Sequence, residues 1–187
     1  YRVVQWATGN VGRHAMKAVI AHPRMSLVGV WVHSDEKAGR DAGELCGLGH
    51  EIGVTATRDI AEIIALRPDC VVYMPQSVQV DDVCRLLESG ANIVTSVVEF
   101  HHPGSLEPDV RARVEEACRR GDSSLHSTGS SPGVLTEALP LILCTLQRRL
   151  DFLTIDQFAD LSERDSPTLI FDFLGWGKKP ADFKERQ

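Results

Sequence analysis

The feature that most constrains the fold of this chain is its first segment, YRVVQWATGNVG at residues 1–12. An apolar strand at Arg2–Trp6 runs into a tight turn, and a helical pattern begins directly behind the turn. The small residues of the turn have the spacing A-x-G-x-x-G, a variant of the dinucleotide-binding fingerprint in which Ala7 replaces the first glycine. In that motif the middle glycine lets the backbone approach a pyrophosphate, the last lets the helix pack on the strand, and the helix N-terminus attracts phosphate. The predicted cofactor-binding residues of this turn are Ala7, Thr8, Gly9, Asn10, Val11 and Gly12. An ordinary strand-to-helix turn that binds nothing is the alternative.

Strand and helix patterns alternate over the first two thirds of the chain. After the first strand, further strands are predicted at residues 27–32, 52–55, 70–74, 92–98 and 123–126. The continuous apolar run at 27–32 is typical of a strand buried on both faces of a parallel sheet. Strands separated by helices predict an α/β fold, namely a Rossmann-type doubly wound parallel sheet.

The helices between these strands are marked by caps and by apolar spacing. The first runs from Val11 to about His22, with a predicted inner face at Val11, Ala15, Ala18 or Val19, and His22. Thr57 is the predicted N-cap of a second helix. Further helices are predicted over residues 80–87, from Pro108 in a first turn, and from Ser131 to Leu146 with a kink at Pro140.

The pattern changes after Arg149. Residues 152–158 alternate between apolar and polar positions, which predicts a half-exposed strand, and the apolar run 169–174 ends at a Gly-Trp-Gly break. A segment of this length buries too little surface to be stable alone. We therefore expect a nucleotide-binding domain at 1–149, followed at 150–187 by the beginning of an α+β substrate and dimerisation domain that is truncated in this chain.

Composition excludes several classes of function. The formal net charge of −6 gives no basic field, so no nucleic-acid partner is expected. No apolar run is long enough to span a bilayer and no signal pattern is present, so we expect no membrane partner and a cytoplasmic location. The five cysteines are scattered without C-x-x-C spacing, as free thiols of a reducing compartment are. No metal site is predicted, since the adjacent His101 and His102 point in different directions.

Ligands of doubly wound sheets bind at the carboxyl ends of the strands, where the predicted loops are rich in small or polar residues. The loop after the second strand selects the nucleotide. His33, Ser34 and Lys37 suit a 2′-phosphate through charge-assisted hydrogen bonds, whereas Asp35 suits the bare ribose hydroxyls of NAD. We favour NADP(H) as the cofactor, with NAD(H) as the alternative. A third possibility is that this charged loop is solvated and binds no nucleotide.

Two further strand ends complete the predicted site. Met74, Pro75 and Gln76 lie at the end of the fourth strand, where the cofactor's ribose and phosphates pass. Ser96 lies at the end of the fifth, where the nicotinamide is expected. Glu99 is the predicted catalytic residue, because a carboxylate there would hold the charge of an amine or iminium and mediate proton transfer during hydride transfer. A surface glutamate without a role is the alternative, and three histidines are weaker candidates: His101, His102 and His126. Residues 127–133 form either a further ligand loop or a hinge.

These motifs together resemble the amine dehydrogenase and 2,4-diaminopentanoate dehydrogenase family, which has a dihydrodipicolinate-reductase-like N-terminal domain. The matching stretches are VVQWATGNVG at 3–12, VGVWVHSDEKAGRDAGEL at 28–45, VVYMPQ at 71–76, NIVTSVVEF at 92–100, HSTGSSPGVLTEALPL at 126–141 and SPTLIFDFLGWGKKPADF at 166–183. The resemblance implies NAD(P)H-dependent reductive amination of a ketone or aldehyde, or oxidative deamination of a primary amine. It also implies a small-molecule amine or carbonyl substrate, a homodimer, and Glu99 as the carboxylate placed against the amine.

Two departures from the family leave alternatives open. Dihydrodipicolinate reductases carry a paired-histidine and lysine motif after the hinge, whereas His101 and His102 precede the hinge here and no matching lysine follows. Family members also continue well past residue 187. The alternatives are therefore a reductase of another imine or carbonyl, and a dinucleotide-binding module without catalysis.

Overall fold

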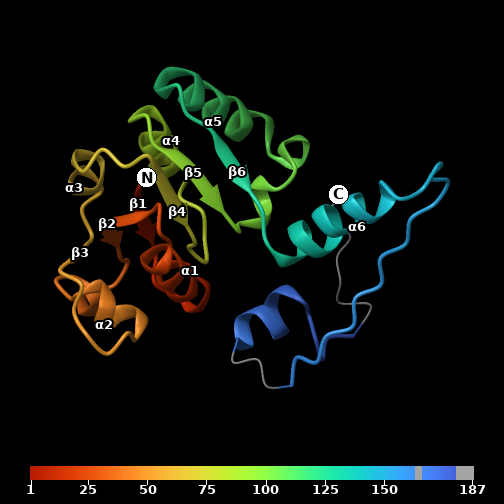
Figure 1. Cartoon of the computed structure of the whole chain (residues 1–187), viewed down its shortest axis with the longest axis horizontal. Coiled ribbons are helices and arrows are strands. Elements are labelled where there is room, and N and C mark those ends of the chain that lie inside the picture. The colour runs from red at the N-terminus through yellow and green to blue at the C-terminus, as the bar shows by residue number, and fades with distance from the viewer. Residues whose placement is uncertain (163–165, 180–187) are drawn as a thin grey trace. The chain divides into compact units, whose positions relative to one another are not determined.

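The computed structural model describes residues 1–162 and 166–179. Its described part contains a six-stranded sheet in which all strands are parallel, in the order β3-β2-β1-β4-β5-β6 (Figure 1). The strands are β1 Arg2–Trp6, β2 Ser26–Trp31, β3 Ala56–Thr57, β4 Cys70–Tyr73, β5 Asn92–Thr95 and β6 Leu125–Ser127. The strand order reverses at β1, which places the carboxyl ends of β1 and β4 at the switch point where such sheets bind ligands. The predicted doubly wound parallel sheet is confirmed.

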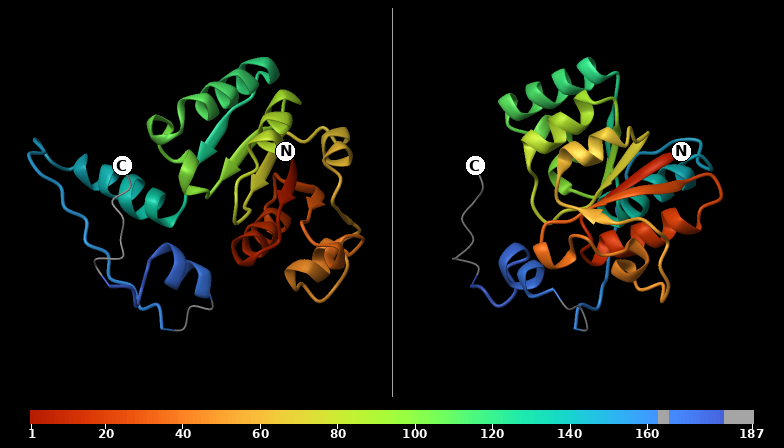
Figure 2. Two further views of the ribbon diagram at one scale, coloured as in Figure 1. Left: turned by 180° about the vertical axis from the view of Figure 1, so that it is seen from behind. Right: turned by 90° about the vertical axis from the view of Figure 1, so that its left-hand side faces the viewer.

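Helices cover both faces of the sheet (Figures 1 and 2). One face carries α1 Asn10–Ala21 and α2 Ala42–Cys46, and the other carries α3 Ile60–Ala65, α4 Val80–Glu88 and α5 Pro108–Gly121. Each face has its own apolar cluster. Val30 of β2 packs in the cluster of α1 and α2, whereas its neighbour Trp31 packs against the cluster of α3, α4 and α5. The strands are therefore buried on both faces, as their continuous apolar runs predict.

The inner face of α1 differs from the prediction. The buried residues are Gly12, Met16 and Val19, whereas the predicted Val11 is exposed. The helix begins at Asn10 with Gly12 packed directly on the end of β1, and the residues one and two turns later follow on that side. Of the predicted inner residues, Val19 is correct.

Three boundaries differ because side chains compete for backbone groups. The predicted strand at 52–55 is wrong: the carboxylate of Asp41 accepts hydrogen bonds from the N–H groups of residues 52, 53 and 54, and pairing with β2 starts at β3. The second helix is capped by Asp59, which accepts from the N–H of Ala61 at 2.7 Å, and not by Thr57. β5 ends at Thr95, whose hydroxyl accepts from the N–H of Val97 at 3.0 Å.

The segment after β6 is helical, although it starts later than predicted. It comprises Ser130–Ala138 and α6 Leu139–Cys144, and Ser131, Pro132 and Gly133 have non-helical dihedral angles. The N–H of Val134 donates to the carbonyl oxygen of Gly129 at 2.8 Å. Helical turns therefore begin at Val134, and Pro140 lies in the first turn of α6.

The chain divides into two compact units, Tyr1–Arg148 and Arg149–Gln187. The described residues of the second unit contain one helix, Thr168–Phe173, and no strand. The predicted strand at 152–158 is therefore wrong: alternation gives a strand two faces, but a strand also needs a neighbouring strand to pair with. Residues 180–183 of the family-like segment 166–183 lie outside the described part. Among the described residues, no helix is both long and apolar enough to cross a bilayer.

Candidate functional site

The turn between β1 and α1 is shaped by Ala7 and Gly12. Ala7 has a φ of 69°, in the left-handed region that favours glycine. A Cβ on Gly12 would lie 2.2 Å from the carbonyl oxygen of Ala7, so the helix packs there only with glycine. Apart from its chain neighbours, a Cβ on Gly9 would meet no atom of the described residues within 4 Å. The turn thus combines a close contact that fixes α1 on β1 with an open stretch of backbone, as pyrophosphate binding requires.

Within the described ranges, no side chain caps the N-terminus of α1. Gly9 is the N-cap and offers no side chain, and the first helical turn contains no acidic residue. Unbonded N–H groups and the positive end of the helix dipole favour an anion here. Of the predicted residues, Thr8 is buried, while Asn10 and Val11 are exposed. The turn fits the phosphates of a dinucleotide.

Gln5 supports this turn from beneath, and sequence reasoning missed it. The side chain is fully buried, and its Nε2 donates to the carbonyl oxygens of Ala7 at 2.9 Å and of Trp6 at 3.2 Å. Its Oε1 has no partner within the part of the chain that the structure describes. The signal was an amide inside an otherwise apolar strand, since a buried amide needs a polar partner. Gln5 holds the carbonyl of Ala7 in place.

The predicted nucleotide-selecting loop lies next to the glycine turn. The N–H of Ala7 donates to the carbonyl oxygen of Trp31 at 2.9 Å, and Nζ of Lys37 lies 3.5 Å from the carbonyl oxygen of Thr8. His33 and Ser34 connect the end of β2 to a 3-10 turn at Asp35–Lys37. The structure thus brings these predicted residues to the same edge of the sheet as the glycine turn.

The other predicted cofactor residues share this edge. The N–H of Met74 donates to the carbonyl oxygen of Trp6 at 3.0 Å, and the hydroxyl of Ser96 donates to the Met74 sulfur at 3.1 Å. Pro75 is half-buried and Gln76 is exposed. The ends of β1, β4 and β5 are therefore linked at the switch point.

An aromatic cluster underlies this edge. The rings of Trp6 and Trp31 stack with their centroids 4.1 Å apart and an angle of 6° between their planes. The ring centroid of Tyr73 lies 5.7 Å from that of Trp6. The Tyr73 hydroxyl accepts from the N–H of Gln79 at 3.2 Å, and burial raises the pKa of Tyr73. The strand ends beneath the candidate site are thus held by the buried rings of Trp6 and Tyr73 and the half-buried ring of Trp31.

The predicted catalytic residue stands apart from these contacts. Glu99 lies in a 3-10 turn at Val98–Phe100, next to the buried Phe100. Its carboxylate is exposed, and it makes no hydrogen bond or ion pair with any residue in the described ranges. The structure places Glu99 just beyond β5 but does not bond it to the other predicted residues.

The adjacent histidines His101 and His102 have different surroundings. Nε2 of His101 pairs with the carboxylate of Glu137 from the helical segment after β6, whereas His102 is exposed. Across residues 1–162 and 166–179, no group of three or more His, Cys, Asp or Glu side chains is placed to hold a metal ion. His101 therefore joins the segment after β5 to the segment after β6.

Comparison with known proteins gives the family. Residues 3–116 match the model of the dihydrodipicolinate reductase N-terminus. The amine dehydrogenase of Streptomyces virginiae is 38% identical over 97% of this chain and 52% of its own length. The amine dehydrogenase structure from Mycobacterium smegmatis matches with a TM-score of 0.70 and 25% identity, over 80% of this chain and 45% of that one.

A more distant structure shares the fold alone. Biliverdin reductase of Synechocystis, solved with biliverdin and NADP⁺, matches with a TM-score of 0.54 and 17% identity, over 76% of this chain and 42% of that one. The chain spans about half the length of the amine dehydrogenases that it matches. The family model covers more than half of the chain, and its residues contain the glycine turn and five of the strands described above. The chain belongs to the family of the dihydrodipicolinate reductase N-terminal domain.

Proposed function

We propose that this chain is the cofactor-binding part of an NAD(P)H-dependent oxidoreductase that acts on C–N bonds. The observation that carries the proposal is the turn at residues 7–12, where the close contact of Gly12 with Ala7 leaves the backbone at Gly9 open. The 38% identity of the chain to an amine dehydrogenase supports reductive amination of a carbonyl or oxidative deamination of a primary amine. The reacting partner would be a small amine, ketone or aldehyde.

Different residues at the carboxyl edge of the sheet would bind different parts of the cofactor. The turn at 7–12 would hold the pyrophosphate, and His33, Ser34 and Lys37 would hold the adenosine ribose, with NADP(H) favoured over NAD(H). Met74, Pro75, Gln76 and Ser96 would contact the nicotinamide half. When bound, the nicotinamide ring supplies or accepts the hydride.

Glu99 would bind the nitrogen of the substrate. Its carboxylate is exposed and is unpartnered among the described residues, so an ammonium or iminium group meets no competing cation there. It would hold that positive charge and exchange a proton with the nitrogen.

Residues 1–149 would form the cofactor domain, and residues 150–187 would belong to the substrate and dimerisation domain of a homodimer. Five free cysteines agree with a reducing, cytoplasmic location.

The proposal is tested by titrating the protein with NADPH and NADH and following the nucleotide fluorescence. We expect NADPH to bind more tightly, and failure of both to bind at millimolar concentration would refute the dinucleotide site. A second assay follows NADPH consumption with ketones or aldehydes in the presence of ammonia. Consumption that requires ammonia supports C–N chemistry, and consumption that proceeds equally without it would point to reduction of the carbonyl itself.

A further inference from the structure

Asp35 and Arg58 form an ion pair across the carboxyl ends of β2 and β3. Arg58 directly follows β3, and the parallel pairing continues up to it through the hydrogen bond from Val32 N–H to the Thr57 carbonyl oxygen at 2.9 Å. The backbone of Arg58 is fixed as well, since the indole N–H of Trp31 donates to its carbonyl oxygen at 3.0 Å. The backbone that carries the guanidinium is therefore held in place beside the loop that selects the nucleotide.

This ion pair occupies the acidic side chain that an NAD-binding site would need. In the dinucleotide-binding fold, an acidic residue after the second strand accepts hydrogen bonds from the ribose hydroxyls. Asp35 has that place in the chain, but its carboxylate is engaged by Arg58. The pair is exposed, with 47% of the Arg58 and 88% of the Asp35 side chain accessible. An exposed pair contributes little free energy, so another anion can replace Asp35 as the partner of Arg58.

A second cation faces the same turn from the other side. Asp35 and Lys37 belong to one 3-10 turn, and Nζ of Lys37 reaches to within 3.5 Å of the Thr8 carbonyl oxygen in the glycine turn. The end of β2 is thus bordered by Lys37 toward β1 and by Arg58 toward β3. A guanidinium offers parallel N–H donors that match two oxygens of a phosphate group.

We infer that Arg58 is a specificity-determining residue of the nucleotide site. It binds the 2′-phosphate of NADP(H) in place of the Asp35 carboxylate, and without that phosphate its guanidinium competes with the ribose hydroxyls of NAD(H) for Asp35. Arg58 thereby acts twice in favour of the phosphorylated cofactor. This inference rests on the proposed function, since it concerns the same nucleotide site.

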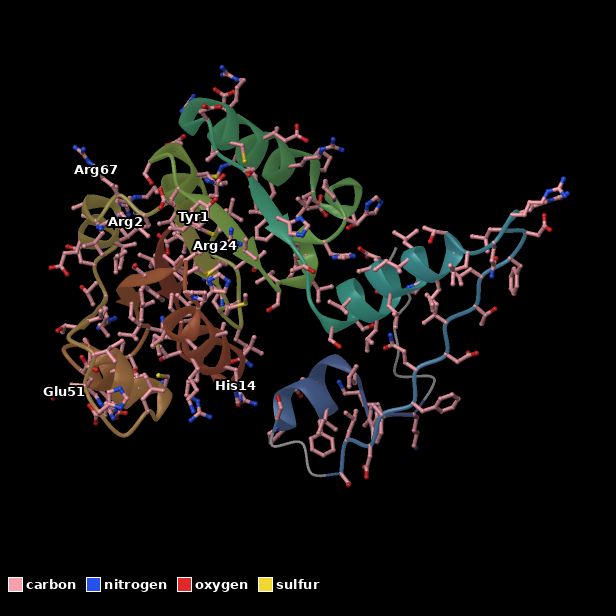
Figure 3. The ribbon with its side chains drawn as sticks, viewed as in Figure 1. Tyr1, Arg2, His14, Arg24, Glu51 and Arg67 are labelled. Atoms are coloured by element: carbon pink, nitrogen blue, oxygen red, sulfur yellow. The ribbon has the colours of Figure 1, made fainter. Side chains whose placement is uncertain are left out.

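The test compares Arg58→Gln with Arg24→Gln as a matched control. Both substitutions remove one positive charge, but Arg24 lies at the amino ends of β1 and β2, where its carbonyl oxygen accepts from the Tyr1 amino group (Figure 3). A strand of this length separates the two positions by about 20 Å, beyond the screening length of about 10 Å at 0.1 M salt. Dissociation constants for NADPH and NADH are measured by nucleotide fluorescence, together with the melting temperature.

We expect Arg58→Gln to weaken NADPH binding by about tenfold or more, because it removes charge-assisted hydrogen bonds. Binding of NADH should not weaken, because Asp35 becomes free to accept from the ribose. The double variant Asp35→Asn/Arg58→Gln should then bind NADH less tightly than Arg58→Gln. Arg24→Gln should match the wild type for both nucleotides.

The outcomes separate this inference from the proposed function. If the wild type binds neither nucleotide, the proposed function fails. If the wild type prefers NADPH but Arg58→Gln binds both nucleotides as the wild type does, the site stands and the role of Arg58 is refuted. Equal weakening of NADPH and NADH by Arg58→Gln also refutes that role, because a 2′-phosphate contact affects only NADPH.

Discussion

A Cβ atom on Gly12 would lie 2.2 Å from the carbonyl oxygen of Ala7, a distance at which the backbone has to move. The first turn of α1 therefore packs directly on the backbone of Ala7, just beyond the end of β1. Gly9, in the same turn, has a φ of −68° and open space where its Cβ would be. The two glycines of one fingerprint thus have different functions: Gly12 permits packing, and Gly9 borders the space proposed for the pyrophosphate.

Gly12→Ala should destabilise the fold. The added methyl group would also lie 3.1 Å from Nε2 of Gln5, so α1 has to move away from the strand. Overpacking of this kind costs about 1–3 kcal/mol of unfolding free energy. Urea denaturation followed by circular dichroism measures the loss. A variant as stable as the wild type would show that α1 moves freely on the sheet.

Gly9→Ala should leave stability unchanged and weaken cofactor binding. The φ of Gly9 suits alanine, and apart from its chain neighbours no atom of the described residues lies within 4 Å of the new Cβ, so the melting temperature should stay close to that of the wild type. The methyl group would occupy the space proposed for the pyrophosphate, and we expect at least a tenfold weaker dissociation constant for NADPH. A variant that binds NADPH with unchanged affinity would place the phosphates elsewhere.

Ala7→Gly should stabilise the protein. Ala7 has a φ of 69°, a conformation that costs a residue with a Cβ about 1–2 kcal/mol and costs glycine almost nothing. Part of this gain is offset by the greater freedom of glycine in the unfolded chain. The net expectation is about 0.5–1 kcal/mol, or a melting temperature about 2–3 °C higher. Ala7→Val is the control and should lower the melting temperature, since a β-branched residue is strained further there.

Much of the fold could be predicted because it depends on short-range patterns. β1 lies at Arg2–Trp6 as predicted, and Pro108 begins α5 because its fixed φ and missing N–H suit a first helical turn. The misplaced strand at 52–55 had a different cause. Its N–H groups bond to the carboxylate of Asp41, which lies more than ten residues away, and no local pattern reveals such a partner.

The candidate site was predictable only where it lies in loops after strands. The turn at 7–12 and the loop with Lys37 can be proposed from the sequence because they follow apolar runs and are rich in small or polar residues, and the structure brings both to one edge of the sheet. Gln5 and Arg58, which we infer to belong to the site, escape prediction from the sequence for opposite reasons. Arg58 follows a strand of two residues that the sequence placed too early, and Gln5 lies inside a strand, where a polar side chain is read as an interruption of the core.

Asp41→Asn should lower stability at neutral pH. The Asp41 carboxylate accepts from the N–H groups of Ile52, Gly43, Gly53 and Val54, and these bonds lower its pKa, with Ile52 contributing most. A pKa that is lower in the folded state stabilises the fold above the unfolded value of about 3.9, and the contribution is lost as the pH falls through the folded pKa. An amide has only one acceptor oxygen, so the loop at 42–54 loses bonds.

Melting curves of the wild type and Asp41→Asn between pH 7 and pH 3 test this expectation. The variant should melt several degrees lower at pH 7. The difference should begin to shrink below about pH 4, where Asp41 of the unfolded chain becomes protonated, and should shrink further as the pH falls toward the lower pKa of the folded state. Asp156→Asn removes the same charge from an exposed position and serves as the control. A difference that stays constant over this range would show that the charge of Asp41 does not contribute.

Glu99→Gln should abolish most of the activity without affecting the fold. Glu99 is exposed, and it has no hydrogen bond or ion pair with the residues that the structure describes, so its charge does not stabilise the chain. The loss of a group that transfers a proton typically lowers kcat about 10²–10⁴-fold. The dissociation constant for NADPH should stay unchanged, because the proposed nucleotide contacts are made by other residues. Ammonia-dependent NADPH consumption measures kcat, and Glu107→Gln, which removes another exposed carboxylate nearby in sequence, is the control. An unchanged kcat in Glu99→Gln would remove Glu99 from the mechanism, and an equal loss in Glu107→Gln would mean that only the local charge matters.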